Sequence, residues 1–135
     1  LTEHDLGTVH ARLEEMLAAE SAHIDAIYHC PHHPDVGEGH YRQACACRKP
    51  APGMVLAAAS DLDIDLANSI LIGDQATDIE AGKRAGIGRT FLVRTGHGRR
   101  LPENLEEISS CPSAVYADAE AALAAALDIL RPGSR

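Results

Sequence analysis

The sequence Ser69-Ile70-Leu71-Ile72-Gly73-Asp74 decides the fold class of this chain. Its apolar run has the length of a buried strand, and Gly73 lets the backbone turn where the run ends. A helix is predicted next, over residues 77–85, and Gly86 acts as its C-terminal breaker. A strand that passes directly into a helix is typical of a parallel α/β sheet.

The same alternation continues on both sides of this unit. Further helices are predicted over residues 3–20, 52–62 and 118–130, and further strands over residues 24–29, 89–93 and 114–116. Strands and helices that alternate with short loops predict a Rossmann-like α/β fold, in which helices flank a parallel sheet. With 135 residues, we expect a single domain over residues 1–135.

Composition limits the classes of function. The formal net charge of −8, from 12 basic and 20 acidic residues, argues against a nucleic-acid partner. No apolar run reaches the roughly 18 residues of a membrane span, so no membrane partner is expected. The chain does not open with a signal peptide, and clustered cysteines favour a reducing compartment, so we expect a cytoplasmic protein.

Three of the four cysteines gather in one segment with a histidine. Cys30-Pro31-His32 is followed, after residues 33–44, by Cys45-Ala46-Cys47. Thiolates and imidazoles are the usual ligands of tetrahedral zinc. The spacing therefore predicts a structural zinc site in a loop over residues 30–50, with Cys30, His32, Cys45 and Cys47 as ligands.

Other interpretations of these side chains exist. The cysteines could be reduced or form a disulfide in a surface loop, although a one-residue spacer would strain a bond between Cys45 and Cys47. His29 and His33 flank the ligand positions and compete with His32. Cys111 stands apart and is expected to be a lone thiol. The remaining histidines are expected to be isolated and exposed: His4, His10, His23, His40 and His97.

Charged residues suggest a phosphate and magnesium site. Asp74 follows the apolar strand, at the edge of an open parallel sheet where ligands bind. Mg²⁺ takes oxygen ligands and usually one or two carboxylates, although Asp74 and Asp78 are equally well interpreted as helix caps. Arg48 and Lys49 directly follow Cys47, so a metal there would fix two cations that could hold a phosphate rather than remain solvated.

These motifs together resemble one enzyme family, the D-glycero-D-manno-heptose-1,7-bisphosphate 7-phosphatases of the haloacid dehalogenase superfamily. The resemblance covers about residues 1–98, and its zinc loop is highly specific. It rests on these stretches: Cys30-Pro31-His32-His33-Pro34, Tyr41-Arg42-Gln43-Ala44-Cys45-Ala46-Cys47-Arg48-Lys49-Pro50-Ala51-Pro52-Gly53-Met54, Gly73-Asp74-Gln75-Ala76-Thr77-Asp78 and Leu92-Val93-Arg94-Thr95-Gly96.

The resemblance implies a Mg²⁺-dependent phosphatase that removes the 7-phosphate of the heptose bisphosphate, a step toward ADP-heptose for the lipopolysaccharide core. The reaction would pass through an aspartyl-phosphate. By matching motif positions, Lys49 would bind phosphate and Arg48 the substrate. Asp74 would be the Mg²⁺ ligand, and Asp78 its supporting carboxylate. Zinc would be structural and Mg²⁺ catalytic.

The chain departs from this family in two ways. Gln75 stands where the family has lysine. The D-x-D motif of the nucleophile and the strand that carries the phosphate-binding Ser or Thr are not found, because the D-x-D letters within residues 61–65 follow a helix instead of an apolar strand. We therefore expect the first two strands to be absent from this chain, the chain alone to be inactive, and an N-terminal segment or a second chain to supply the nucleophile.

Two alternatives remain open from the sequence. Histidinol-phosphate phosphatases share the paired zinc ligands, and a related sugar phosphatase would fit the same motifs. A zinc-stabilised binding domain without catalysis belongs to a different class. An intact mass and a search for a co-purifying D-x-D fragment would separate the enzyme from the scaffold.

Overall fold

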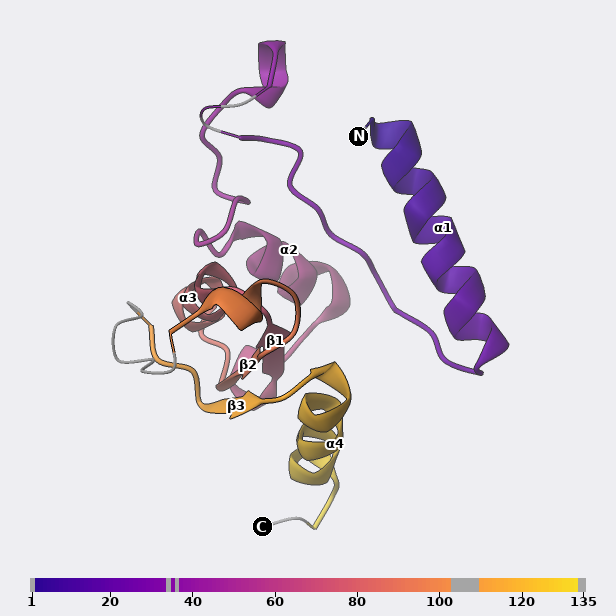
Figure 1. The fold of residues 1–135 in the computed structure, drawn as a ribbon, viewed down its shortest axis with the longest axis vertical. Helices are drawn as coiled ribbons and strands as arrows, with labels where there is room; N and C mark the ends of the chain where they lie inside the picture. Colours follow the sequence, from indigo (N-terminus) through magenta and orange to yellow (C-terminus); the bar gives the residue numbers. More distant parts are fainter. Residues whose placement is uncertain (1, 34, 36, 103–109, 134–135) are drawn as a thin grey trace.

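The computed structural model describes residues 2–33, 35, 37–102 and 110–133. The chain forms helices and strands in alternation (Figure 1). Their order is α1 (Glu3–Ala19), η1 (Gly39–Tyr41), α2 (Gly53–Leu62), η2 (Leu66–Asn68), β1 (Ile70–Gly73), α3 (Ala76–Ala85), β2 (Arg89–Val93), η3 (Gly96–Arg100), β3 (Ala114–Tyr116) and α4 (Ala119–Leu130), where η marks a 3₁₀ helix.

The three strands form one parallel sheet in the order β1-β2-β3. Ile72 pairs with Phe91, and Phe91 pairs with Ala114 on its other side. Parallel neighbours need a crossover, and α3 supplies the one between β1 and β2. The predicted α/β class, with helices flanking a parallel sheet, is confirmed.

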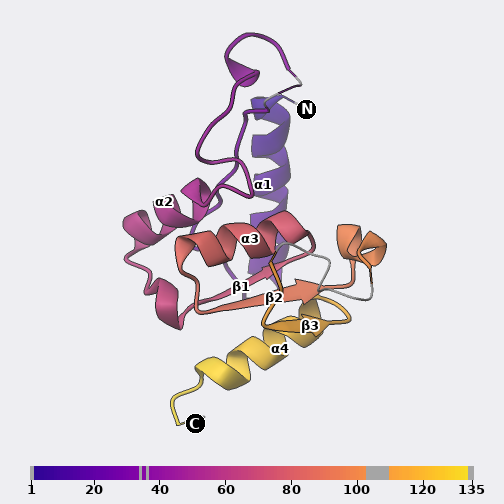
Figure 2. The ribbon, with the colours of Figure 1, turned by 90° about the vertical axis from the view of Figure 1, so that its left-hand side faces the viewer.

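Helices cover both faces of this sheet, as Figure 2 shows with α3 above the strands and α4 below them. Phe91 and Val93 point to the α4 side, where they form a buried cluster with Ala122 and Ala126. Alternate strand residues face opposite sides, so Thr90 lies on the α3 side, next to Gly82. Short side chains let the helices approach closely, which suits a core with few aromatic rings.

Helix α3 ends as its sequence predicts. Gly86 takes the left-handed conformation, with φ of 89°, and its N–H bonds to the carbonyl of Lys83. A residue with a Cβ is strained in this conformation, whereas glycine adopts it freely. The chain can therefore turn back at once into β2. The carboxyl ends of β1 and β2 then lie side by side.

The predicted strand over residues 24–29 is wrong, because this segment contains no strand. Its alternation of apolar and polar residues is present, but a strand forms only where a neighbour completes the ladder of backbone hydrogen bonds. No strand of the described residues lies beside it. The segment is tied to α2 instead, where the Tyr28 hydroxyl donates to Asp61 Oδ2 at 2.9 Å.

Helix α1 forms as predicted but stands apart from the sheet in Figure 1. Its apolar residues Val9, Leu13 and Met16 stay largely exposed. Strand β1 likewise pairs only with β2 among the strands of the described residues. No helix in the same residues combines the length and apolar character needed to cross a membrane.

Candidate active site and metal centre

A compact group of Cys30, His32, Cys45 and Cys47 occupies the predicted metal loop. One donor atom of each residue lies within 4.8 Å of the others. Cys30 Sγ lies 3.3 Å from Cys45 Sγ and 3.0 Å from Cys47 Sγ. The Sγ atoms of Cys45 and Cys47 are 2.8 Å apart. A disulfide requires about 2.05 Å, and all three cysteines are free thiols.

The donor set has the size and chemistry of a zinc site. With Zn–S bonds of about 2.3 Å, a tetrahedral site has edges of roughly 3.7 Å, within the span observed here. A hydrogen bond with Cys47 lowers the pKa of the Cys45 thiol to about 6, whereas bonds to Cys30 and Cys45 raise the pKa of the Cys47 thiol to about 12. Zinc binds cysteine as the thiolate, so a divalent cation held by this group would stabilise its sulfurs in that form.

The metal loop also places two cations. Arg48 Nη1 donates to the backbone carbonyl of His32 at 3.0 Å. The Arg48 side chain is therefore held against the other half of the metal loop. Gly53 N–H donates to the carbonyl of Ala46 at 2.8 Å and joins the loop to the start of α2. In the sequence, Lys49 lies between Arg48 and Gly53, which these two hydrogen bonds hold. Its position therefore depends on the metal group.

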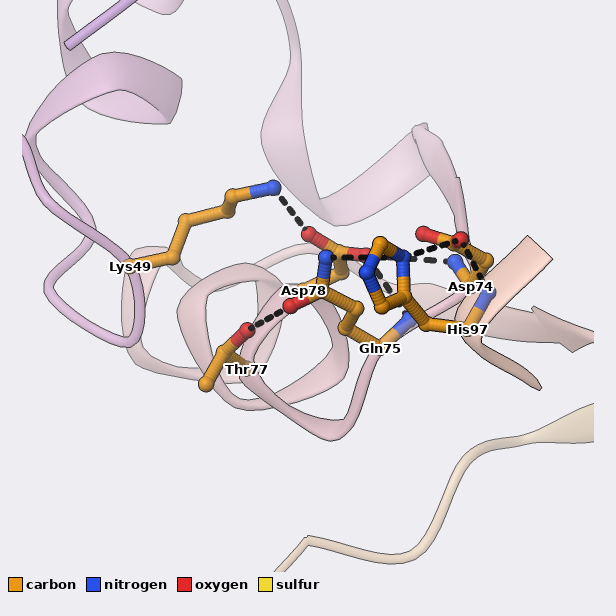
Figure 3. Close-up of polar contacts among 6 residues, drawn as sticks. All are labelled: Lys49, Asp74, Gln75, Thr77, Asp78 and His97. Atoms are coloured by element: carbon orange, nitrogen blue, oxygen red, sulfur yellow. Dashed lines mark hydrogen bonds and ion pairs between the residues drawn. The ribbon is translucent and has the colours of Figure 1, made fainter. Parts of the chain in front are cut away.

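Lys49 forms an ion pair with Asp78, from the first turn of α3 (Figure 3). The Asp78 side chain is only 9% exposed and Lys49 is 41% exposed. Asp78 Oδ2 also accepts the N–H groups of Asp74 at 3.1 Å and Gln75 at 2.9 Å. This carboxylate therefore holds both the lysine and the turn after β1. Gly73 is required beneath it, because a Cβ there would overlap the Asp78 carboxylate.

Asp74 lies directly after β1, at the predicted edge of the sheet, and its partner is His97. Asp74 Oδ2 accepts the backbone N–H of His97 at 2.8 Å and lies 3.2 Å from its Nδ1. The backbone N–H, and to a smaller extent the ring, hold the pKa of the Asp74 carboxyl below its ordinary value. Asp74 therefore remains ionised and available to a cation.

His97 is the site residue that the sequence interpretation missed. Its side chain is exposed, at 66%, but it is not isolated as expected. It belongs to η3, which follows β2, and β2 is the neighbour of β1. Since carboxyl ends of adjacent parallel strands meet at one edge, its place just after Arg89–Val93 was the available signal.

A cleft of about 390 Å³ opens beside these groups. Arg48 and Lys49 line it from the metal loop, and Gln75 and Thr77 from the start of α3. Its other lining residues are Tyr28, His29, Cys30 and Met54. The structure thus brings the two predicted substrate-binding cations into one cleft, with Asp78 bonded to Lys49. Asp74 lies one residue before Gln75, on the side of His97.

Comparison with known proteins gives concordant matches. The family model described as HAD-hydrolase-like matches residues 46–125. The D-glycero-beta-D-manno-heptose-1,7-bisphosphate 7-phosphatase of Vibrio cholerae is 51% identical over 79 residues, which are 58% of this chain and 42% of the relative. The D-glycero-alpha-D-manno-heptose-1,7-bisphosphate 7-phosphatase of Burkholderia mallei is 48% identical over 81 residues, 60% of this chain and 43% of the relative.

A solved structure is similar over nearly the whole chain. It is the D,D-heptose 1,7-bisphosphate phosphatase from B. bronchiseptica, complexed with magnesium and phosphate. The TM-score is 0.73 at 35% identity, and the match covers 93% of this chain and 64% of that one. The present chain thus spans less than half the length of the two curated relatives and less than two thirds of the solved structure.

Proposed function

Because this chain belongs to the HAD-hydrolase-like family, we propose that it acts within a Mg²⁺-dependent phosphatase that removes the 7-phosphate from D-glycero-D-manno-heptose 1,7-bisphosphate. The observation that carries this proposal is the cleft of Arg48 and Lys49, with Lys49 held by Asp78 at the carboxyl end of β1. The relatives favour the heptose bisphosphate over histidinol phosphate. Relatives named for both anomers are similar, so the proposal covers both.

Lys49 and Arg48 bind the substrate in this proposal. Lys49 Nζ is a point charge held at the cleft by Asp78, and it binds an oxygen of the phosphate that is removed. Arg48 can bind phosphate or sugar oxygens in bidentate fashion while its Nη1 remains near the His32 carbonyl. The two cations give the cleft a positive wall in a chain that is acidic overall, at −8.

Asp74 is the proposed Mg²⁺ ligand, and the residues present fit this role. Mg²⁺ is usually held by one or two carboxylates together with substrate phosphate and water. Asp74 is ionised and one-third exposed, whereas both oxygens of Asp78 are already bonded. When bound, Mg²⁺ would offset the charge that develops on the transferred phosphoryl group. Asp78 would then support the site by holding Lys49 and the Asp74 backbone.

The nucleophile is proposed to come from outside the described residues. The D-x-D letters of residues 61–65 serve other contacts: Asp61 accepts the Tyr28 hydroxyl, and Asp65 caps η2 by accepting from Asn68. The edge of β1 that faces away from β2 can accept another parallel strand through its backbone groups. We place an aspartate-bearing strand there, from another segment of the same protein or from a second chain.

Zinc at Cys30, His32, Cys45 and Cys47 is proposed to be structural. Four protein ligands leave no position for water or substrate, which a catalytic zinc needs. We also propose that residues 1–135 form a single domain, whose cleft depends on this loop for its position. The free thiols suit a reducing compartment, and the cytoplasm is the proposed location.

Lys49→Ala is expected to lower kcat/KM of the complete enzyme by about 10²-fold, the effect typical of losing one donor to the reacting anion. Zinc content should be unchanged, because Lys49 is not a metal ligand. Steady-state kinetics of phosphate release provide the measurement. Lys83→Ala, which removes the exposed and only other lysine, is the matched control and should retain normal kcat/KM. Equal kinetics for the two variants would remove Lys49 from the phosphate site.

Residues 1–135 by themselves are expected to release no phosphate from heptose bisphosphate, because no described residue supplies the aspartyl nucleophile. A longer polypeptide that adds a strand-Asp-x-Asp-Gly-Thr segment should restore activity, with histidinol phosphate turned over more slowly. Phosphate release is the readout for both. Turnover by residues 1–135 alone would contradict the proposed source of the nucleophile, and faster turnover of histidinol phosphate would contradict the proposed substrate.

A further inference from the structure

The two carboxylate oxygens of Asp74 have different surroundings. Oδ2 receives both contacts from His97, the backbone N–H at 2.8 Å and Nδ1 at 3.2 Å. Figure 3 shows both dashed lines ending on this one oxygen. Among the described residues other than Asp74 itself, none donates a hydrogen bond to Oδ1. The carboxylate is therefore held on one side and free on the other.

The hydrogen on the His97 ring can be assigned from its neighbours. An ionised carboxylate only accepts hydrogen bonds, so Nδ1 must carry the hydrogen that points to Asp74 Oδ2. The amide nitrogen of Gln75 lies 3.4 Å from the same ring nitrogen, farther than Asp74 Oδ2 at 3.2 Å, and the Gln75 amide oxygen accepts from the Thr77 hydroxyl. The shorter contact, to the Asp74 carboxylate, therefore decides which ring nitrogen carries the hydrogen.

The turn that carries His97 is itself fixed. Arg94 Nη1 donates to the carbonyls of Leu101 at 3.0 Å and Pro102 at 3.2 Å, which closes the segment after η3. Gly96 has a φ of +56°, and a Cβ there would overlap Asp74 Oδ2. The backbone of this turn thus approaches the carboxylate as closely as glycine allows. Because the turn is held by its own contacts, it can fix the orientation of the Asp74 carboxylate.

We propose that His97 is a positioning residue, which binds Oδ2 of Asp74 and leaves Oδ1 as the single oxygen presented to a divalent cation. The inference rests on the proposed function, which places Mg²⁺ at Asp74. Mg²⁺ demands near-ideal octahedral geometry, so a carboxylate fixed to offer one oxygen is better suited than one that rotates. Partners of ligand side chains typically change metal affinity by about 10–100-fold when removed.

The test measures Mn²⁺ binding to the complete, zinc-loaded protein by electron paramagnetic resonance, next to the Mg²⁺ dependence of phosphate release. His97→Ala is expected to weaken Mn²⁺ binding by about tenfold and to raise the Mg²⁺ concentration for half-maximal activity similarly. His97→Asn should restore binding, because its amide nitrogen can occupy the position of Nδ1. His97→Gln, whose amide nitrogen falls near the Nε2 position, should not.

Controls separate positioning from folding. His4→Ala, on the exposed start of α1, should leave Mn²⁺ binding unchanged, and zinc content should be normal in every variant. Asp74→Asn shows the signal expected when Mn²⁺ binding at this site is lost completely. Binding by His97→Ala within twofold of the unchanged protein, or equal rescue by Gln and Asn, would overturn the role of His97 and leave the proposed function standing. Absence of Asp74-dependent Mn²⁺ binding in the unchanged protein would instead overturn Mg²⁺ at Asp74, and this inference with it.

Discussion

Asp74→Asn is expected to lower phosphatase turnover of the complete enzyme by about 10³-fold or more. A metal ligand stabilises developing charge by several kcal/mol, and about 1.4 kcal/mol corresponds to a tenfold change in rate. The substitution removes the charge of the proposed Mg²⁺ ligand and keeps its volume. The amide oxygen of asparagine can still accept the His97 N–H, so the turn between β1 and α3 should remain.

Kinetics and circular dichroism together decide this prediction. Asp128→Asn makes the same chemical change at an exposed position on α4, where the carboxylate pairs only with Arg131 among its described ion-pair partners. Its turnover should match that of the unchanged protein. If Asp74→Asn keeps its turnover at saturating Mg²⁺ while its spectrum is native, Asp74 is not the metal ligand. A lost spectrum would contradict the expectation that the fold tolerates the change.

Cys45→Ser is expected to reduce bound zinc from about one ion per chain to none, because a structural site needs all four ligands. Loss of a structural metal is among the largest single effects on stability, so the free energy of unfolding should fall by about 4 kcal/mol or more. Activity should fall too, since Lys49 lies four residues after Cys45 and depends on the loop for its position.

Elemental analysis and denaturant unfolding provide the two measurements. Cys111→Ser is the matched control, because Cys111 is an exposed free thiol outside the metal group. It should retain zinc and the same unfolding midpoint. Full zinc content in Cys45→Ser would exclude Cys45 as a ligand, and a zinc-free protein of unchanged stability would contradict the structural role of the metal.

Local signals in the sequence were sufficient for most of the sheet and its helices. The apolar run before Gly73 and the left-handed Gly86 both act within a few residues of the elements they delimit. The segment 24–29 has an equally good strand pattern, but it forms no strand because a strand needs a neighbour. Pattern reveals which residues suit a sheet. It does not reveal whether a partner strand is present.

In the candidate site, too, local motifs are recognisable from the sequence, whereas contacts between distant segments are not. The four candidate zinc ligands are recognisable from their spacing, and the structure brings one donor atom of each together. The contact of Lys49 with Asp78 joins residues far apart in the sequence, and it was not specified by either motif. His97 was missed for the same reason. Its contact with Asp74 arises from the pairing of β1 with β2, which is a property of the sheet.

Phosphorus NMR of heptose 1,7-bisphosphate during turnover by the complete enzyme tests the central claim most directly. The account predicts that the signal of the 7-phosphate disappears as free phosphate grows, while the phosphate on the anomeric carbon remains. The same spectrum should stay unchanged with Asp74→Asn. Release of the anomeric phosphate first, or no release at all with zinc and Mg²⁺ both present, would contradict it.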